Sequence, residues 1–243
     1  MARSPYFLFY IILPILIVDG LLEVGMIGET VGFLHDRAGD FFTINASSGT
    51  FDIHGKPKNL LVDQGHTSNG AAGTAVILIG LGGFLTLWLE KRRARKTKNS
   101  ATGHSALFIF WVVMTWLSAA LTLSALIYVN IVVAQTDNQS IALSVAEAHP
   151  DPQMYPLDKW TPDNWFKALL ALPLAHDSDR GTLRYHLRLI SGWRWNLIPL
   201  FVIGAAIALL ATYELVRERR WTTGESREKL RHSGQSGDTY GRA

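Results

Sequence analysis

Two carboxylates one helical turn apart are the residues of this chain best placed to do chemistry. Asp19 and Glu23 lie four residues apart in the apolar stretch 6–27, so a helix would carry both on one face. A carboxylate in hydrocarbon is unfavourable by about 2.5–3.5 kcal/mol at the helix centre, and such residues usually face a bundle interior or a water-filled cavity. This intramembrane acidic pair could therefore bind a cation, relay a proton, or pair with a base from another span or subunit.

Structural roles compete with that chemistry. The span could end near Val18, which would leave both acids among lipid headgroups, or the acids could simply hydrogen-bond neighbouring helices. Residues 1–20 also resemble a cleavable signal peptide, with a basic start, an apolar core and a small residue, Gly20, at the possible cut. We expect the segment to be retained, because the apolar pattern continues through Leu21 and Leu22.

Four apolar stretches position these residues and set the fold class. They are 6–27, 71–89, 106–134 and 196–216. A helix rises about 1.5 Å per residue and the hydrocarbon core is roughly 30 Å thick, so about 20 apolar residues can cross it. The sequence thus predicts an all-α membrane protein, a four-transmembrane-helix bundle whose spans are joined by loops at 28–70, 90–105 and 135–195.

The charges outside these stretches give the orientation. The basic residues of loop 90–105 are Lys91, Arg92, Arg93, Arg95, Lys96 and Lys98. The polar tail 217–243, which we expect to be disordered, is also rich in arginine, whereas acids outnumber bases in both 28–70 and 135–195. Positive charge stays on the cytoplasmic side, so we expect both termini and loop 90–105 in the cytoplasm and the two long loops outside.

The same basic loop bears on the partners of the chain. Bases beside the membrane attract anionic lipid by about 1 kcal/mol each, although setting the topology is the simpler explanation for them. Because the excess positive charge lies next to the predicted spans, the expected partner is the lipid bilayer and not a nucleic acid.

The chain contains no cysteine, so its outer loops hold no disulfide and it has no thiolate nucleophile. Its order of spans resembles that of claudin-like tetraspan proteins, which carry a cysteine pair in the first outer loop, and the sequence assigns it to no family. Both Asn-x-Ser sequons, at Asn45 and Asn138, fall in the predicted outer loops and are candidate glycosylation sites. We therefore expect the protein in the plasma membrane or in an endomembrane of the secretory pathway.

Small and aromatic residues predict how the spans pack. Gly73, Gly80 and Gly83 place small residues along the second span, where helix backbones can approach closely. The third span is too long for the hydrocarbon core, so we expect it to tilt or to extend beyond the outer leaflet. Trp193 and Trp195 precede the fourth span as interfacial anchors at headgroup depth.

The outer loops are predicted to form a small extracytoplasmic cap. Two short β-prone runs around a polar turn predict a hairpin over 41–54. Thr161 and Pro162 are typical of a helix start, and the apolar residues after them predict an amphipathic helix over 162–172 that lies on the leaflet or caps the bundle. Residues 177–191 favour a second helix, although their alternation also fits a strand.

Three functional hypotheses follow. We expect a non-catalytic tetraspan scaffold or accessory subunit of a larger membrane complex, present as a homo-oligomer or with a partner protein, without cofactor or metal. The first alternative is an oligomeric channel or transporter that uses Asp19 and Glu23. The second is a membrane enzyme that acts on lipid or glycan at the outer face, with acid–base groups among the outer histidines. Those histidines are His35, His54, His66, His149, His176 and His186, and no pair has the spacing of a zinc motif.

Overall fold

The computed structural model describes residues 6–37, 40–57, 59–96, 103–148 and 159–237. The protein is mostly helical. Four helices are long and apolar enough to cross a membrane, namely Phe9–Asp36, Asp63–Arg95, Ala106–Gln135 and Asp177–Glu218. They contain three of the four predicted apolar stretches in full, and the first helix contains residues 9–27 of the stretch predicted at 6–27.

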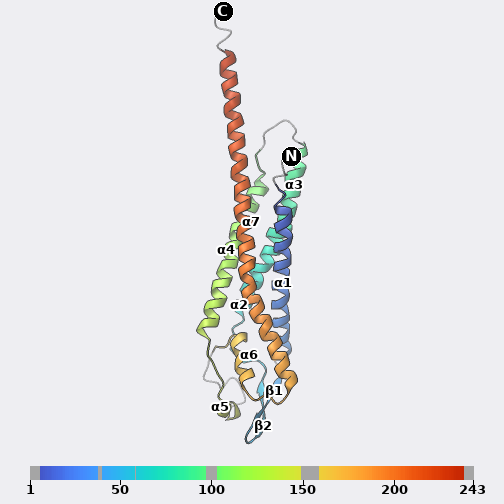
Figure 1. Ribbon diagram of the computed structural model, residues 1–243, viewed down its shortest axis with the longest axis vertical. Coiled ribbons are helices and arrows are strands. Elements are labelled where there is room, and N and C mark those ends of the chain that lie inside the picture. The colour runs from blue at the N-terminus through green and yellow to red at the C-terminus, as the bar shows by residue number, and fades with distance from the viewer. Residues whose placement is uncertain (1–5, 38–39, 58, 97–102, 149–158, 238–243) are drawn as a thin grey trace, which may run out of the picture. The chain divides into compact units, whose positions relative to one another are not determined.

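The elements follow one another along the chain as Figure 1 colours them. They are α1 (Phe9–Asp36), β1 (Phe41–Ala46), β2 (Gly49–His54), α2 (Asp63–Thr74), the π-helical η2 (Ala75–Leu81), α3 (Gly82–Lys96), α4 (Ala106–Gln135), α5 (Leu143–Ala148), α6 (Pro162–Ala171) and α7 (Asp177–Gly237). They form two compact units. Unit 1 contains residues 1–17, 75–119 and 202–243, and unit 2 contains residues 18–74 and 120–201.

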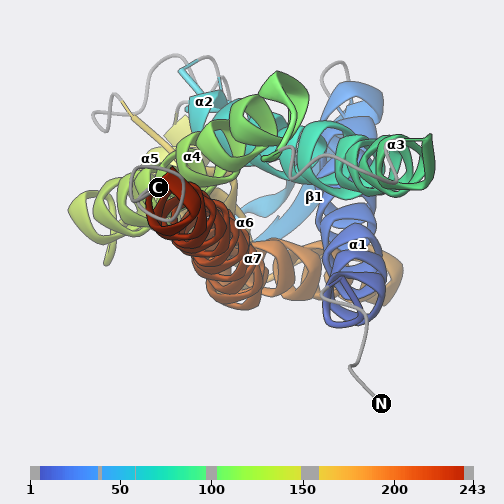
Figure 2. The same ribbon diagram turned by 90° about the horizontal axis from the view of Figure 1, so that it is seen from above.

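Unit 1 is a bundle of helical segments with Trp111 of α4 in its interior. Its segments are seen close to end-on in Figure 2. The Trp111 side chain is 3% exposed, and its ring meets that of Phe9 edge-on with centroids 5.6 Å apart. Its indole N–H donates to the backbone carbonyl of Ile79 at 3.3 Å, inside η2, where π-helical winding changes the backbone hydrogen-bond pattern.

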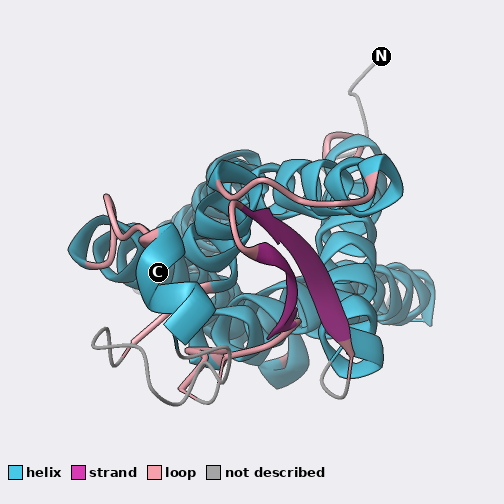
Figure 3. Ribbon diagram, turned by 90° about the horizontal axis from the view of Figure 1, so that it is seen from below, coloured by secondary structure: helices cyan, strands magenta, loops and turns pink. Residues whose placement is uncertain are grey.

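The strands of unit 2 form an antiparallel hairpin, shown in Figure 3. The register pairs Phe41 with His54 at the open end, and Gly49 has a φ of 138° beside the turn, a conformation that favours glycine. The inward side chains are fully buried: Phe42, Ile44 and Ile53. The hairpin that the sequence predicts over 41–54 is therefore confirmed.

A third segment extends this hairpin. Ile44 forms an isolated antiparallel bridge with Leu174, and the Asn45 backbone N–H donates to the Pro173 carbonyl at 2.8 Å. An isolated hairpin is only marginally stable in water, so a third partner and a buried apolar face supply the support that it needs.

Helix α6 is the most enclosed element of unit 2. The Thr161 hydroxyl accepts from the backbone N–H of Asn164, and Pro162 occupies the first turn, as the sequence predicts. Residues on both faces of α6 are buried, from the apolar Trp165 to the charged Asp163, which forms an ion pair with Lys167 at 2.5 Å. This burial favours a packing role for α6 over contact with a lipid leaflet.

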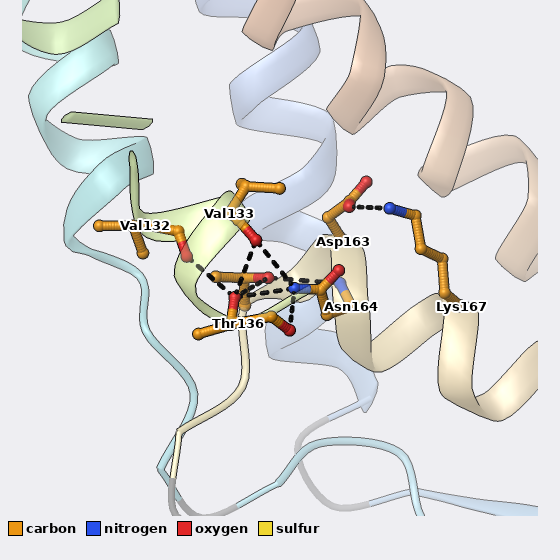
Figure 4. A network of polar contacts seen from close by, with 7 residues as sticks. Val132, Val133, Thr136, Asp163, Asn164 and Lys167 are labelled. Atoms are coloured by element: carbon orange, nitrogen blue, oxygen red, sulfur yellow. Dashed lines mark hydrogen bonds and ion pairs between the residues drawn. The ribbon is translucent and has the colours of Figure 1, made fainter. Parts of the chain in front are cut away.

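The side chain of Asn164 joins α6 to the end of α4, as Figure 4 shows. Its amide donates to the Thr136 carbonyl at 2.5 Å and to the Thr136 hydroxyl at 2.7 Å. It also lies 3.4 Å from the Val133 carbonyl. The last carbonyls of a helix have no partner within the helix, so this amide satisfies acceptors that would otherwise be buried without one.

Three helices extend beyond the predicted spans, and the tail differs from its prediction. α1 continues to Asp36 because Thr30 and Leu34 keep a buried face beyond residue 27. α2 begins at Asp63, and α7 begins at Asp177, where acids in the first turn suit the positive helix N-terminus. Disorder is predicted from residue 217, but α7 remains helical to Gly237, in a segment rich in the helix formers Arg, Glu and Lys.

We expect Asn164→Ala to lower the free energy of unfolding by about 1–3 kcal/mol, because it leaves the Thr136 carbonyl buried without its donor. Thermal unfolding of the detergent-purified protein measures the loss. Asn130→Ala is the matched control, since that amide donates to Leu126 within its own helix. Equal effects of both substitutions would contradict the role of Asn164.

Candidate functional site

Glu23 is a fully buried carboxylate in the interior of unit 2. Its side chain is 0% exposed, and Asp19, one turn earlier on α1, is half-buried. Neither carboxylate oxygen of Glu23 makes a hydrogen bond of regular geometry with the described residues. Nor does any described base form an ion pair with either acid. A buried carboxylate in such a place is strongly unfavourable unless it is protonated or bound to a cation.

Asn196 of α7 is the polar side chain beside this pair. Its amide donates to the backbone carbonyl of Asp19 at 3.2 Å, and it interacts with the Glu23 carboxyl. The hard oxygen atoms of the two carboxyls suit a proton or an alkali or alkaline-earth cation better than a soft metal ion, and the Asn196 amide adds a hydrogen-bond donor beside them. Asn196 is not included in the site predicted from the sequence, although a lone asparagine at the start of an apolar stretch could have indicated a polar contact there.

The same face of α1 continues its contact with α7 within unit 2. A Cβ at Gly192 would lie 2.9 Å from the Met26 sulfur, so the glycine allows close approach of the helices. Further along, the Phe33 ring stacks on the His186 ring with centroids 3.8 Å apart. As residue numbers rise along α1 they fall along α7, so the two helices are antiparallel here and the contact fixes the register that brings Asn196 to the acids.

The opposite face of α1 is open and lined by glycine. Gly25, Gly28 and Gly32 are spaced by three and four residues, so they follow one side of the helix. All three are exposed, and a Cβ at each would have no neighbouring atom within 4 Å. We call these three residues the glycine face of α1. This face is not predicted from the sequence, although Gly28 and Gly32 have the Gly-x-x-x-Gly spacing of closely packed helix pairs.

Two of the three glycines predicted to mediate packing lie at close contacts within unit 1. A Cβ at Gly83 would lie 2.7 Å from the Trp111 ring, and one at Gly80 would overlap the Ile17 side chain. Gly73, in unit 2, has open space at its Cβ position. Close contacts at these glycines therefore occur at Gly80 in η2 and at Gly83 in α3, whereas Gly73 in α2 has no close neighbour.

The predicted interfacial and glycosylation residues differ in their exposure. Trp195 is 51% exposed and the Arg194 guanidinium lies over its ring at 5.0 Å, but Trp193 is 3% exposed and so is enclosed by the chain itself. Asn45 and Asn138 are both exposed, and Asn138 has a φ of 62° in the turn after α4. Both sequons are therefore accessible at their side chains.

The predicted basic cluster is exposed where the structure describes its side chains. These are Lys91, Arg92, Arg93 and Arg95. Lys98 and the side chain of Lys96 lie outside the described part. The acid of this segment, Glu90, is buried instead: its carboxylate accepts from the Ser105 backbone N–H at 3.1 Å and lies 3.5 Å from the His104 ring.

His104 is a buried polar contact of unit 1 that the sequence does not single out. Its Nδ1 faces Glu90, and its Nε2 lies 2.5 Å from the Glu218 carboxylate of α7. The ring stacks on Phe108 with centroids 4.0 Å apart. The cluster fastens the segment before α4 to α3 and α7.

The predicted outer histidines that the structure describes do not form a shared metal site. His35 contacts the Val31 carbonyl of its own helix, His54 lies against the Phe41 ring, and His149 lies outside the described residues. Within the described ranges, no group of three or more His, Asp or Glu side chains could hold a metal ion.

Comparison with known proteins assigns no relative. The chain matches no protein-family model, no curated protein sequence and no solved structure.

The glycines of the second long helix allow a direct test of packing. We expect Gly83→Leu to lower the thermal unfolding midpoint of the purified protein by several degrees, because overpacking a filled site costs about 1–3 kcal/mol. Gly73→Leu, made in open space on the same continuous helical stretch, should leave the midpoint nearly unchanged. A reversed order of the two variants would refute the close contact at Trp111.

Proposed function

We propose that this chain is a four-span integral membrane protein that acts without catalysis, as a scaffold or accessory subunit bound to another membrane helix through the glycine face of α1. The observation that carries the proposal is that Gly25, Gly28 and Gly32 are exposed and uncovered on an otherwise apolar helix. In lipid the hydrophobic effect does not drive helices together, so close backbone approach at small residues becomes a main source of association.

The exposed apolar surface supports the membrane part of this proposal. Large apolar side chains point outward on every long helix, and examples are Leu22, Ile77, Phe110 and Leu209. Soluble monomers rarely expose contiguous apolar surface on this scale, whereas hydrocarbon covers it at no cost. The partner helix would come from a second copy of the chain or from another protein of the same membrane.

We expect Gly28→Leu combined with Gly32→Leu to weaken association by about tenfold, or roughly 1.4 kcal/mol, because leucine side chains hold the partner backbone away. Energy transfer between differently labelled copies, and recovery of partner proteins in a mild detergent, measure the loss.

Gly204→Leu serves as the control, since this glycine also has an open Cβ position in an apolar helix but has no second glycine three or four residues away. Resistance to alkaline carbonate extraction checks that every variant is membrane-integrated. A wild-type protein that is monomeric and carries no partner would rule out the assembly role.

The buried Glu23 favours a second candidate, an oligomeric channel or transporter that moves a proton or small cation. Its carboxylate has no basic partner in the described chain, and one carboxylate oxygen of Asp19, one turn earlier on α1, is also buried without a hydrogen-bond partner. Binding a cation would offset the unfavourable burial of the charge.

We expect Glu23→Gln to abolish proton or alkali-cation uptake into proteoliposomes while expression and thermal stability are kept, because the amide fills the same space without the charge. The flux is followed with a pH-sensitive dye and with a potassium- or sodium-sensitive dye. Glu29→Gln is the control, since Glu29 is an exposed acid on the same helix. Unchanged uptake in Glu23→Gln, or no uptake by the wild type, would exclude this candidate.

A further inference from the structure

Within unit 1, the end of α3 forms a pocket that combines an aromatic ring with free positive charge. The pocket has a volume of about 370 Å³ and is lined by Trp88, Lys91, Arg92 and Arg95. Lys91 and Arg92 lie three and four residues after Trp88, and Arg95 lies three residues after Arg92, so a single side of α3 carries all four. All four are exposed.

The described part of the chain places no acid in an ion pair with the bases of this pocket, Lys91, Arg92 and Arg95. Glu90, the nearest acid in sequence, is turned away and held by Ser105 and His104. The Arg92 guanidinium lies over the Trp88 ring, 5.2 Å from its centroid, which orients its donors before any ligand arrives. The site therefore offers an anion several unpaired donors within one concave surface.

The surface that leads to the pocket is apolar. Leu81, Leu85 and Trp88 lie on the same side of η2 and α3 and are 54%, 55% and 51% exposed. An exposed apolar strip that ends at a tryptophan and then at basic residues matches the layers of a membrane, from acyl chain through interface to headgroup. A free phosphate ion would use the bases and leave this strip uncovered, whereas a phospholipid would cover both.

We propose that the Trp88–Lys91–Arg92–Arg95 pocket binds the phosphate of an anionic glycerophospholipid, with its acyl chains along Leu81 and Leu85. The proposal rests on the membrane insertion argued above. Guanidinium groups bind phosphate through paired N–H donors, and the ammonium of Lys91 adds a further charge. The basic cluster thus has a defined binding place, in addition to any effect on topology.

The test is lipid-dependent stabilisation of the purified full chain in a neutral detergent. Short-chain dioctanoyl phosphatidic acid should raise the thermal unfolding midpoint in a saturable way, and dioctanoyl phosphatidylcholine should raise it much less. Arg92→Gln combined with Arg95→Gln should weaken the apparent affinity for phosphatidic acid by about tenfold or more, because two bases near an anionic surface are lost.

Arg93→Gln is the matched control, because it removes a neighbouring exposed charge that does not line the pocket. Equal stabilisation by phosphatidylcholine, or an equal loss of affinity in Arg93→Gln, would overturn the proposal, since either result indicates general detergent or charge effects. Inorganic phosphate that reproduces the full shift would overturn it as well, because a free anion would then suffice. If carbonate extracts the protein from membranes, the membrane proposal fails; a retained protein without anionic preference refutes the pocket alone.

Discussion

Exposed apolar surface on long helices is the constraint on which the rest of this structure depends. Ile77 and Leu209 are among the most exposed side chains of their helices, and neither has an apolar neighbour to cover it fully. In hydrocarbon each backbone polar group must be satisfied within its own element, and long uninterrupted helices do this. In the membrane that we propose for this chain, the hydrophobic drive between helices is absent, and contacts at small residues would help to hold unit 1 together. Gly83 against Trp111 is such a contact.

Unit 2 differs from unit 1 because it encloses backbone polar groups that lie outside regular helices and need hydrogen-bond partners. Its hairpin gains a third segment at Leu174. The Trp165 indole donates to the Gly55 carbonyl at 2.9 Å, and the Asn164 amide donates to the Thr136 carbonyl. A Cβ at Gly55 would lie 2.8 Å from the Arg37 carbonyl, so only glycine fits where the chain leaves the hairpin. The unit is held by hydrogen bonds with specified partners, in contrast to the packing contacts of unit 1.

Much of this could be predicted from the sequence, for physical reasons that differ between elements. Long apolar stretches and the Thr161–Pro162 helix start are local signals, so the long helices and α6 follow directly. The face of a helix that is buried is not local: α1 is apolar nearly all round, and its sequence does not tell that Glu23 points inward while Gly28 remains open. The His104 contacts join segments more than 100 residues apart in sequence, as with the Glu214 carbonyl. The hydrophobic periodicity of a sequence does not predict contacts between residues so far apart along the chain.

The placement of Glu23 also distinguishes two explanations for the acidic pair that the sequence leaves open, namely pairing with a partner's base and binding of a proton or cation within the chain. An intramembrane acid can pair with a base from a partner protein, which would make the acidic pair part of an assembly surface. Glu23 is enclosed by its own chain at 0% exposure, and its neighbour Asn196 belongs to the same unit, so a partner's base cannot reach it while unit 2 stays folded. The glycine face lies on the other side of α1. The two proposed roles, assembly and cation binding, would therefore use different faces of one helix, and each can be tested by substitutions that leave the other face unchanged.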